Sequence, residues 1–165
     1  MSTVSGTAVP LSHSPTWFTA LVSSYFASGR REAAPPKPTA LVIDDEGPIR
    51  ELLSLYLDGE GLEVATVRSA DGAKALVQHG QFDVVILDWM LEGVDGRELL
   101  HLWKAQHPDI PVIIFSGADL DEGGNGDRFP READAVVRKG GPLEALSTAI
   151  FRSLERRKAQ PSNAA

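Results

Sequence analysis

The chain has 165 residues, of which 42% are hydrophobic and 24% are charged, a balance typical of globular proteins and unlike that of membrane-spanning or disordered chains. Its 16 basic and 23 acidic residues give a formal net charge of -7, which opposes attraction to phosphate backbones and argues against a nucleic-acid partner. The absence of cysteine excludes disulfides, thiolate metal sites and cysteine nucleophiles, and it favours a cytoplasmic location. No apolar run approaches the roughly 18 residues of a membrane span.

A proline-rich connector, residues 33–38, marks the clearest change in composition. Proline fixes backbone angles and removes amide donors, so this stretch suits an extended linker. We expect an N-terminal extension over 1–38, one domain over 39–158 and a short tail over 159–165.

The extension carries the pattern of an amphipathic helix over about residues 15–28, with Ser14 as N-cap, Pro15 in the first turn and Gly29 at the end. Six large apolar side chains share one face of it: Trp17, Phe18, Leu21, Val22, Tyr25 and Phe26. The helix is too short to cross a bilayer. Three outcomes stay open: docking on its own domain, binding another protein or a second copy of the chain, or marginal order.

Beyond the linker, short apolar runs alternate with segments of helical spacing. The runs, which read as strands buried on both faces, are 40–43, 64–67, 84–87, 112–115 and 135–137. This alternation predicts an α/β domain with a doubly wound, five-stranded parallel sheet and helices on both faces. The second run lacks a reactive group at its end, as expected of an edge strand in the order 2-1-3-4-5. Glycines and Pro130 make a long helix in the fourth crossover, 116–134, unfavourable and favour a loop there.

Polar residues follow four of the five strands. They are Asp44, Asp45 and Glu46 after the first strand, Asp88 after the third, Ser116 after the fourth and Lys139 after the fifth. The carboxyl ends of parallel strands form the usual ligand crevice, so the three aspartates should converge there. Converging carboxylates repel one another unless a cation lies between them, and oxygen ligands suit Mg²⁺. With a lysine and a hydroxyl opposite, the set indicates phosphoryl transfer, with Asp88 as the nucleophile.

These residues resemble the receiver domain of bacterial two-component response regulators. The segments that carry the resemblance are Val42–Glu46, Ile86–Met90, Gly93–Gly96, Ser116–Gly117 and Lys139. The likeness spans about residues 39–158 and implies the flavodoxin-like arrangement of that family.

The resemblance also assigns roles to individual residues. It implies that Mg²⁺ is held by the carboxylates of Asp44, Asp45 and Asp88 and by the backbone carbonyl of Met90. Asp88 would accept a phosphoryl group from a histidine kinase or a histidine phosphotransfer protein. Ser116 would follow the phosphoryl group on activation, and Lys139 would bind one of its oxygens. The expected role is a single-domain regulator that signals to an unknown protein target, with a homodimer as one option and no catalysis beyond its own phosphorylation and dephosphorylation.

Two departures from the family pattern keep an alternative open. Val136 lies three positions before Lys139, where the family usually has an aromatic residue, and Gly140 and Gly141 precede the proline that normally follows the lysine directly. A degenerate receiver that binds partners without phosphorylation is therefore the second hypothesis. An aspartate-nucleophile phosphatase is disfavoured, because Met90 stands where such an enzyme needs a second aspartate.

Overall fold

The computed structural model describes residues 36–78, 81–117 and 130–159. The chain divides into two units, Met1–Pro36 and Lys37–Ala165, and all described helices and strands belong to the second. The helix expected at 15–28 and most of the fourth crossover lie outside the described residues, so both remain predictions.

Five parallel strands form the central sheet. They are β1 (Thr39–Ile43), β2 (Glu63–Val67), β3 (Val84–Leu87), β6 (Val112–Ser116) and β7 (Ala135–Arg138). Their spatial order is β2-β1-β3-β6-β7, with every neighbouring pair parallel. Counted along the chain this is the predicted order 2-1-3-4-5, and the doubly wound fold is confirmed.

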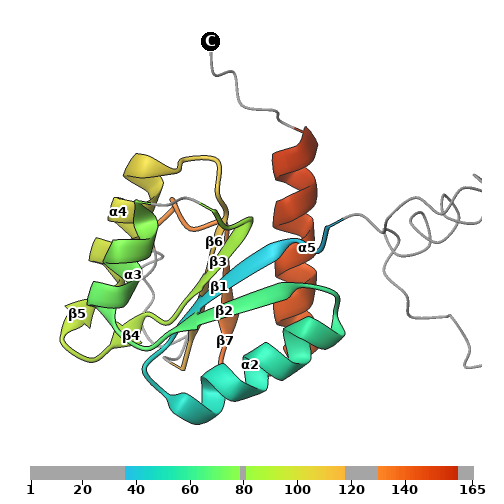
Figure 1. Cartoon of the computed structure of the whole chain (residues 1–165), viewed down its shortest axis with the longest axis horizontal. Helices are drawn as coiled ribbons and strands as arrows, with labels where there is room; N and C mark the ends of the chain where they lie inside the picture. The colour runs from blue at the N-terminus through green and yellow to red at the C-terminus, as the bar shows by residue number, and fades with distance from the viewer. Residues whose placement is uncertain (1–35, 79–80, 118–129, 160–165) are drawn as a thin grey trace, which may run out of the picture. The chain divides into compact units, whose positions relative to one another are not determined.

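Among the described residues, four helices cover the sheet, two on each face (Figure 1). They are α2 (Gly47–Gly59), α3 (Ala70–Val77), α4 (Gly96–Gln106) and α5 (Leu143–Ala159). Local sequence explains where two of them begin. Ser69 accepts a hydrogen bond from the Gly72 amide at the start of α3. Asp95 accepts one from the Arg97 amide at the start of α4. A proline in the first turn of α2 is equally compatible with a helix start.

Alternate residues of each central strand feed two separate cores. Leu41 and Ile43 of β1 pack with α3 and α4 around Trp103, whereas Ala40 and Val42 pack with α2 and α5 around Leu146. This period of two explains why an unbroken apolar run is needed in a strand with helices on both faces.

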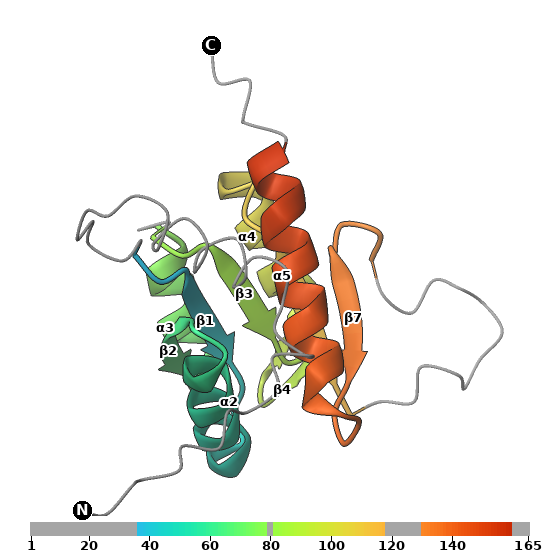
Figure 2. The ribbon, with the colours of Figure 1, turned by 90° about the vertical axis from the view of Figure 1, so that its right-hand side faces the viewer.

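The two edge strands depart from the expectation of burial on both faces. No residue of β2 is buried, and in β7 only Val137 is. β7 lies at the open side of the sheet beside α5 (Figure 2). An edge strand has a neighbour on one side only, so an apolar run of the same composition is covered less completely there.

A short antiparallel hairpin that the sequence analysis did not predict follows β3. It consists of β4 (Met90–Leu91) and β5 (Val94–Asp95), joined by a turn in which Gly93 has a φ of 81°. Glycine adopts this left-handed conformation without steric cost, which suits it to the turn. The hairpin leads the chain directly from the end of β3 into α4.

Candidate functional site

The register of β1 and β3 places two aspartates side by side. Ile43 pairs with Leu87, and the ladder continues one step further because the Asp88 amide donates to the Ile43 carbonyl at 2.8 Å. Asp44 and Asp88 therefore follow neighbouring strands at the same level of the sheet, as predicted from the sequence.

The pairing of β6 and β7 likewise places Ser116 and Lys139, the other two predicted residues, side by side. Ser116 pairs with Arg138, and the Lys139 amide donates to the Ser116 carbonyl at 2.8 Å. The Ser116 side chain is buried. The polar residues of these four strands thus lie together at the end of the sheet formed by the carboxyl ends of the strands.

Three carboxylates at the carboxyl ends of the strands surround one ammonium group. Lys139 Nζ lies 2.8 Å from Asp44 Oδ2, 2.8 Å from Asp88 Oδ2 and 2.8 Å from Glu46 Oε1. The two aspartates are almost fully buried, with 2% and 4% of their side chains exposed, whereas 59% of Glu46 is exposed. We call Asp44, Glu46, Asp88 and Lys139 the carboxylate cluster.

Tight turns hold the second oxygen of each buried aspartate. Asp44 Oδ1 accepts a hydrogen bond from the Glu46 amide at 2.9 Å, and Asp88 Oδ1 accepts one from the Met90 amide at 3.1 Å. The Arg50 guanidinium donates to the Asp44 carbonyl at 2.7 Å. Both carboxylates are consequently fixed at each of their two oxygens.

Burial and hydrogen bonding act in opposite directions on the pKa values of the cluster. Burial raises the pKa of Asp44, and hydrogen bonds from Lys139 and the Glu46 amide offset only part of that rise. Burial by itself lowers the pKa of Lys139, but hydrogen bonds to Asp44, Asp88 and Glu46 outweigh it and raise that pKa well above its ordinary value. The lysine is therefore a permanent cation at physiological pH.

The structure places Asp45 differently from its two acidic neighbours. Asp45 Oδ2 accepts a hydrogen bond from the Glu92 amide at 3.1 Å, at the hairpin turn. Among the described residues, Asp44, Glu46 and Asp88 form the group whose ligand oxygens all lie within 4.8 Å of one another. From the sequence, Glu46 was named among the polar residues that follow the first strand but was assigned no role in the site.

The donor set of the cluster fits a hard divalent cation. It offers carboxylate oxygens only, from two buried and one exposed side chain. Mg²⁺ favours oxygen ligands, accepts one or two carboxylates and keeps several waters, which the exposed side of the cluster can admit. The Met90 side chain is exposed, so of this residue only the backbone carbonyl could contribute a ligand.

Trp89, next to Asp88, is packed closely against the start of α4. A Cβ at Gly96 would come within 2.9 Å of both the Cα and the carbonyl oxygen of Trp89. The Arg97 guanidinium lies 5.8 Å from the centre of the Trp89 ring, on its face. Gly96 is therefore required for the close approach that fixes the backbone beside Asp88.

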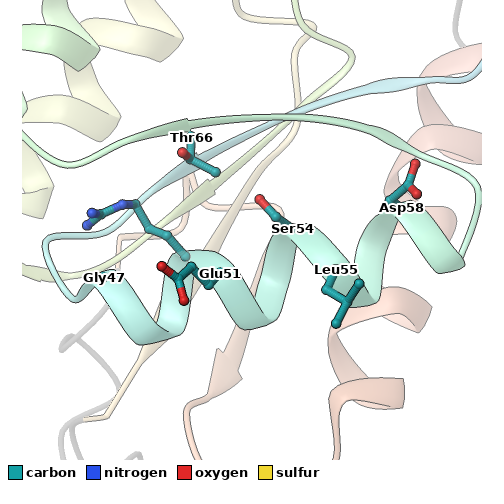
Figure 3. A pocket seen from close by; sticks show the side chains of 7 residues that line it. Gly47, Glu51, Ser54, Leu55, Asp58 and Thr66 are labelled. Carbon is teal, nitrogen blue, oxygen red and sulfur yellow. The ribbon is translucent and has the colours of Figure 1, made fainter.

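A shallow groove of about 550 Å³ runs along α2 and β2 (Figure 3). Arg50, Glu51, Ser54, Leu55 and Asp58 of α2 and Thr66 of β2 line it. None of the carboxylate cluster takes part in this lining, so the chemistry of the strand ends lies outside the groove.

Comparison with known proteins identifies the family. The model of the response regulator receiver domain matches residues 40–151, which is more than half of the chain. The chain belongs to the response regulator receiver family. Receivers in this family take phosphoryl groups within two-component systems, and they bind Mg²⁺ through acidic residues such as those of the carboxylate cluster.

Individual relatives agree with this assignment. The nitrogen assimilation regulatory protein NtrX of Azorhizobium caulinodans is 40% identical over 79 residues, which are 47% of this chain and 17% of NtrX. The chain likewise covers only 36% and 35% of two transcriptional regulatory proteins that it matches. The receiver thus corresponds to a minor part of each of these longer regulators.

Solved receiver structures superpose on most of the chain. A receiver domain protein from Clostridium thermocellum has 31% sequence identity and a TM-score of 0.65, covering 74% of this chain and 98% of the other. The response regulator TrrA from Thermotoga maritima, in complex with Mg(2+)-BeF, has 28% identity and a TM-score of 0.63, covering 70% of this chain and 98% of TrrA.

In the part of this receiver that the structure describes, no helix is long and apolar enough to cross a membrane.

Proposed function

We propose that this receiver accepts a phosphoryl group on Asp88 from a phosphohistidine of a histidine kinase or histidine phosphotransfer protein. The observation that carries the proposal is the contact of Lys139 with Asp88, 2.8 Å from ammonium to carboxylate, beside the buried Asp44. A nucleophilic carboxylate, a second buried carboxylate and a fixed cation are the parts that phosphoryl transfer to aspartate requires.

The proposed step uses the described side chains in defined roles. An oxygen of Asp88 forms a bond to phosphorus as the phosphorus–nitrogen bond of the donor breaks. The electron pair of that bond returns to the donor nitrogen, leaving a neutral imidazole whose other nitrogen carries the proton. Lys139 donates to an oxygen of the transferred group, and Ser116, buried at the end of β6, donates to another.

We assign Mg²⁺ to the open side of the cluster, with Asp44 and Asp88 as ligands. The resemblance to the family adds Asp45 and the Met90 carbonyl, although Asp45 is not part of the group of close carboxylates. Asp45 holds the Glu92 amide through Oδ2, so Oδ1 is the oxygen with which it would bind the ion. When bound, Mg²⁺ neutralises the phosphoryl and carboxylate charge. The complex of TrrA with Mg(2+)-BeF supports a magnesium site in this chain, because a relative with the same fold binds that ion.

The test is phosphorylation by acetyl phosphate, followed by intact mass. We expect a gain of one phosphate that requires Mg²⁺ and is lost in Asp88→Asn. Asp71→Asn, which makes the same change at an exposed position on α3, serves as the matched control and should gain phosphate normally. Ser116→Ala and Lys139→Met should gain the phosphate more slowly than the wild type, because each removes a donor to the transferred group.

One observation favours a second function, that of a receiver that binds its partners without phosphorylation. Val136 lies on β7 where the family usually has an aromatic residue, and it is packed against the core formed with α3 and α4. A wild-type protein that gains no phosphate from acetyl phosphate or from purified kinases would favour this alternative. Gain of phosphate on Asp88 would exclude it.

Other expectations about the biological context stay predictions. They are output through protein contact as a single-domain regulator, pairing of two copies, a cytoplasmic location and the lack of a nucleic-acid partner. The last rests on the net charge of -7. Since some relatives are transcriptional regulators, a direct DNA-binding measurement is needed to test it.

A further inference from the structure

Lys139 uses all of its hydrogen-bonding capacity inside the carboxylate cluster. An ammonium group has three N–H donors, and three carboxylate oxygens lie at 2.8 Å from Nζ, one each from Asp44, Glu46 and Asp88. Only 11% of the lysine side chain is exposed. A phosphoryl oxygen on Asp88 can therefore accept a hydrogen bond from Lys139 only if one of the three carboxylates gives up its own hydrogen bond to the ammonium.

The surroundings of the three acceptors differ in a way that identifies the one that leaves. Asp44 is 2% exposed and its other oxygen is held by the Glu46 amide, so it has no route to water. Asp88 carries the phosphoryl group itself and its other oxygen is held by the Met90 amide, so it stays beside Lys139. Glu46 is 59% exposed, makes no capping hydrogen bond at the start of α2 and can turn its carboxylate into solvent.

We propose that Glu46 is the exchangeable partner of Lys139. In the unphosphorylated protein it holds the third N–H of the ammonium, and on phosphorylation it yields that N–H to a phosphoryl oxygen and becomes hydrated. Glu46 is thus a positioning residue that acts through Lys139. The inference rests on the proposed phosphorylation of Asp88 and adds to it a residue that sets how readily the phosphorylated state forms.

The expected change in phosphorylation rate follows from the competition between Glu46 and a phosphoryl oxygen for the same N–H of Lys139. Because a hydrogen bond between two charged groups is stronger than one to a neutral amide, Glu46→Gln weakens the bond that must break. We expect the rate constant for phosphorylation by acetyl phosphate to rise by about 3- to 10-fold, with a matching gain in affinity for beryllium fluoride in the presence of Mg²⁺. Beryllium fluoride provides a binding measurement that needs no transfer step.

Two further variants separate partner exchange from simple charge repulsion. Glu46→Asp keeps the negative charge, but its shorter side chain no longer reaches Lys139 at 2.8 Å, so exchange predicts the same acceleration as in Glu46→Gln. If Glu46 instead slows the reaction by repelling the anionic phosphodonor, Glu46→Asp should be phosphorylated at the wild-type rate. Glu63→Gln, at the exposed start of β2, makes the same charge change away from the site and should remain within about twofold of the wild type.

The results decide the two proposals separately. If the wild type neither gains phosphate nor binds beryllium fluoride, the proposed phosphorylation itself fails. If the wild type does both, an unchanged or slower Glu46→Gln overturns the exchange, and so does a wild-type rate in Glu46→Asp. A loss of Mg²⁺ affinity of about tenfold or more in Glu46→Gln, with slower phosphorylation, would instead make Glu46 a metal ligand.

Discussion

The Lys139 ammonium lies 2.8 Å from the Asp88 carboxylate, although the two residues follow different strands and are 51 positions apart in the chain. This ammonium is a cation in direct contact with Asp44 and Asp88, which are both buried, and it neutralises part of their charge. A divalent cation bound by the same carboxylates would take over part of this role. Stability and Mg²⁺ binding should therefore be linked through Lys139.

Lys139→Met tests this linkage. Removing one partner of a buried ion pair leaves the other charges uncompensated, so we expect the free energy of unfolding without metal to fall by about 3 kcal/mol. Mg²⁺ should then stabilise the variant more than it stabilises the wild type, because the ion neutralises carboxylates that no longer have a counterion. Urea unfolding in EDTA and in Mg²⁺ measures both effects. Equal stabilisation of the two proteins by Mg²⁺ would contradict the linkage.

Asp44→Asn should change the dependence of stability on pH. Because burial raises the pKa of Asp44 from 3.8, the folded state binds its proton more tightly than the unfolded state does. The contribution of Asp44 to stability is therefore complete below about pH 3.8 and is lost as the pH rises through the higher folded pKa. In EDTA the variant should be more stable than the wild type at pH 7, with a difference that disappears near pH 4. A constant difference between those pH values would show that ionisation of Asp44 is not its cause.

The backbone of the site could be predicted from the sequence because it depends on periodic patterns. Apolar runs define the strands, and parallel pairing then aligns Ile43 with Leu87, which places Asp44 beside Asp88. Ser116 and Lys139 follow from the same rule at β6 and β7. These positions require no knowledge of side-chain conformation.

The contacts of Asp45 and Glu46 could not be predicted in the same way. The two residues are adjacent and both acidic, and they lie beyond the last residue of β1, where no strand or helix period applies. Their directions depend on tertiary contacts: Asp45 meets the Glu92 amide of a hairpin that the sequence analysis did not predict, and Glu46 meets Lys139. The burial of β2 and β7 was overestimated although the expected order 2-1-3-4-5 already placed both strands at the edges of the sheet, where a strand has one neighbour only.

Gly96→Ala should disturb the site from the first turn of α4. Its Cβ would lie 2.9 Å from the Cα and the carbonyl oxygen of Trp89, and backbone atoms must move to accept it. We expect a loss of stability of about 1–3 kcal/mol and a change in the tryptophan fluorescence of the protein. Gly59→Ala is the control, since its added Cβ at the end of α2 meets no atom from other parts of the structure within 4 Å, and it should change stability by less than about 1 kcal/mol. Equal effects of the two substitutions would rule out the close contact as the cause.

Asp83→Ala should reduce stability without affecting phosphorylation. At the amino end of β3, far along the strand from Asp88, the Asp83 carboxylate accepts hydrogen bonds from the Thr39 amide at 2.9 Å, the Thr39 hydroxyl at 3.1 Å and Arg157 at 3.2 Å. These bonds join β1, β3 and the last turns of α5, so their loss should cost about 1–3 kcal/mol.

Asp58→Ala provides the contrast for Asp83→Ala, because it removes a single ion pair with Lys37 in which both side chains are more than half exposed. Such pairs contribute less than about 1 kcal/mol, so this variant should unfold almost like the wild type. Both variants should take up phosphate from acetyl phosphate at the wild-type rate, because neither residue belongs to the carboxylate cluster. A slower rate in Asp83→Ala alone would mean that the amino end of β3 influences the position of Asp88 at its carboxyl end, and the strand would then act as a mechanical connection between the two.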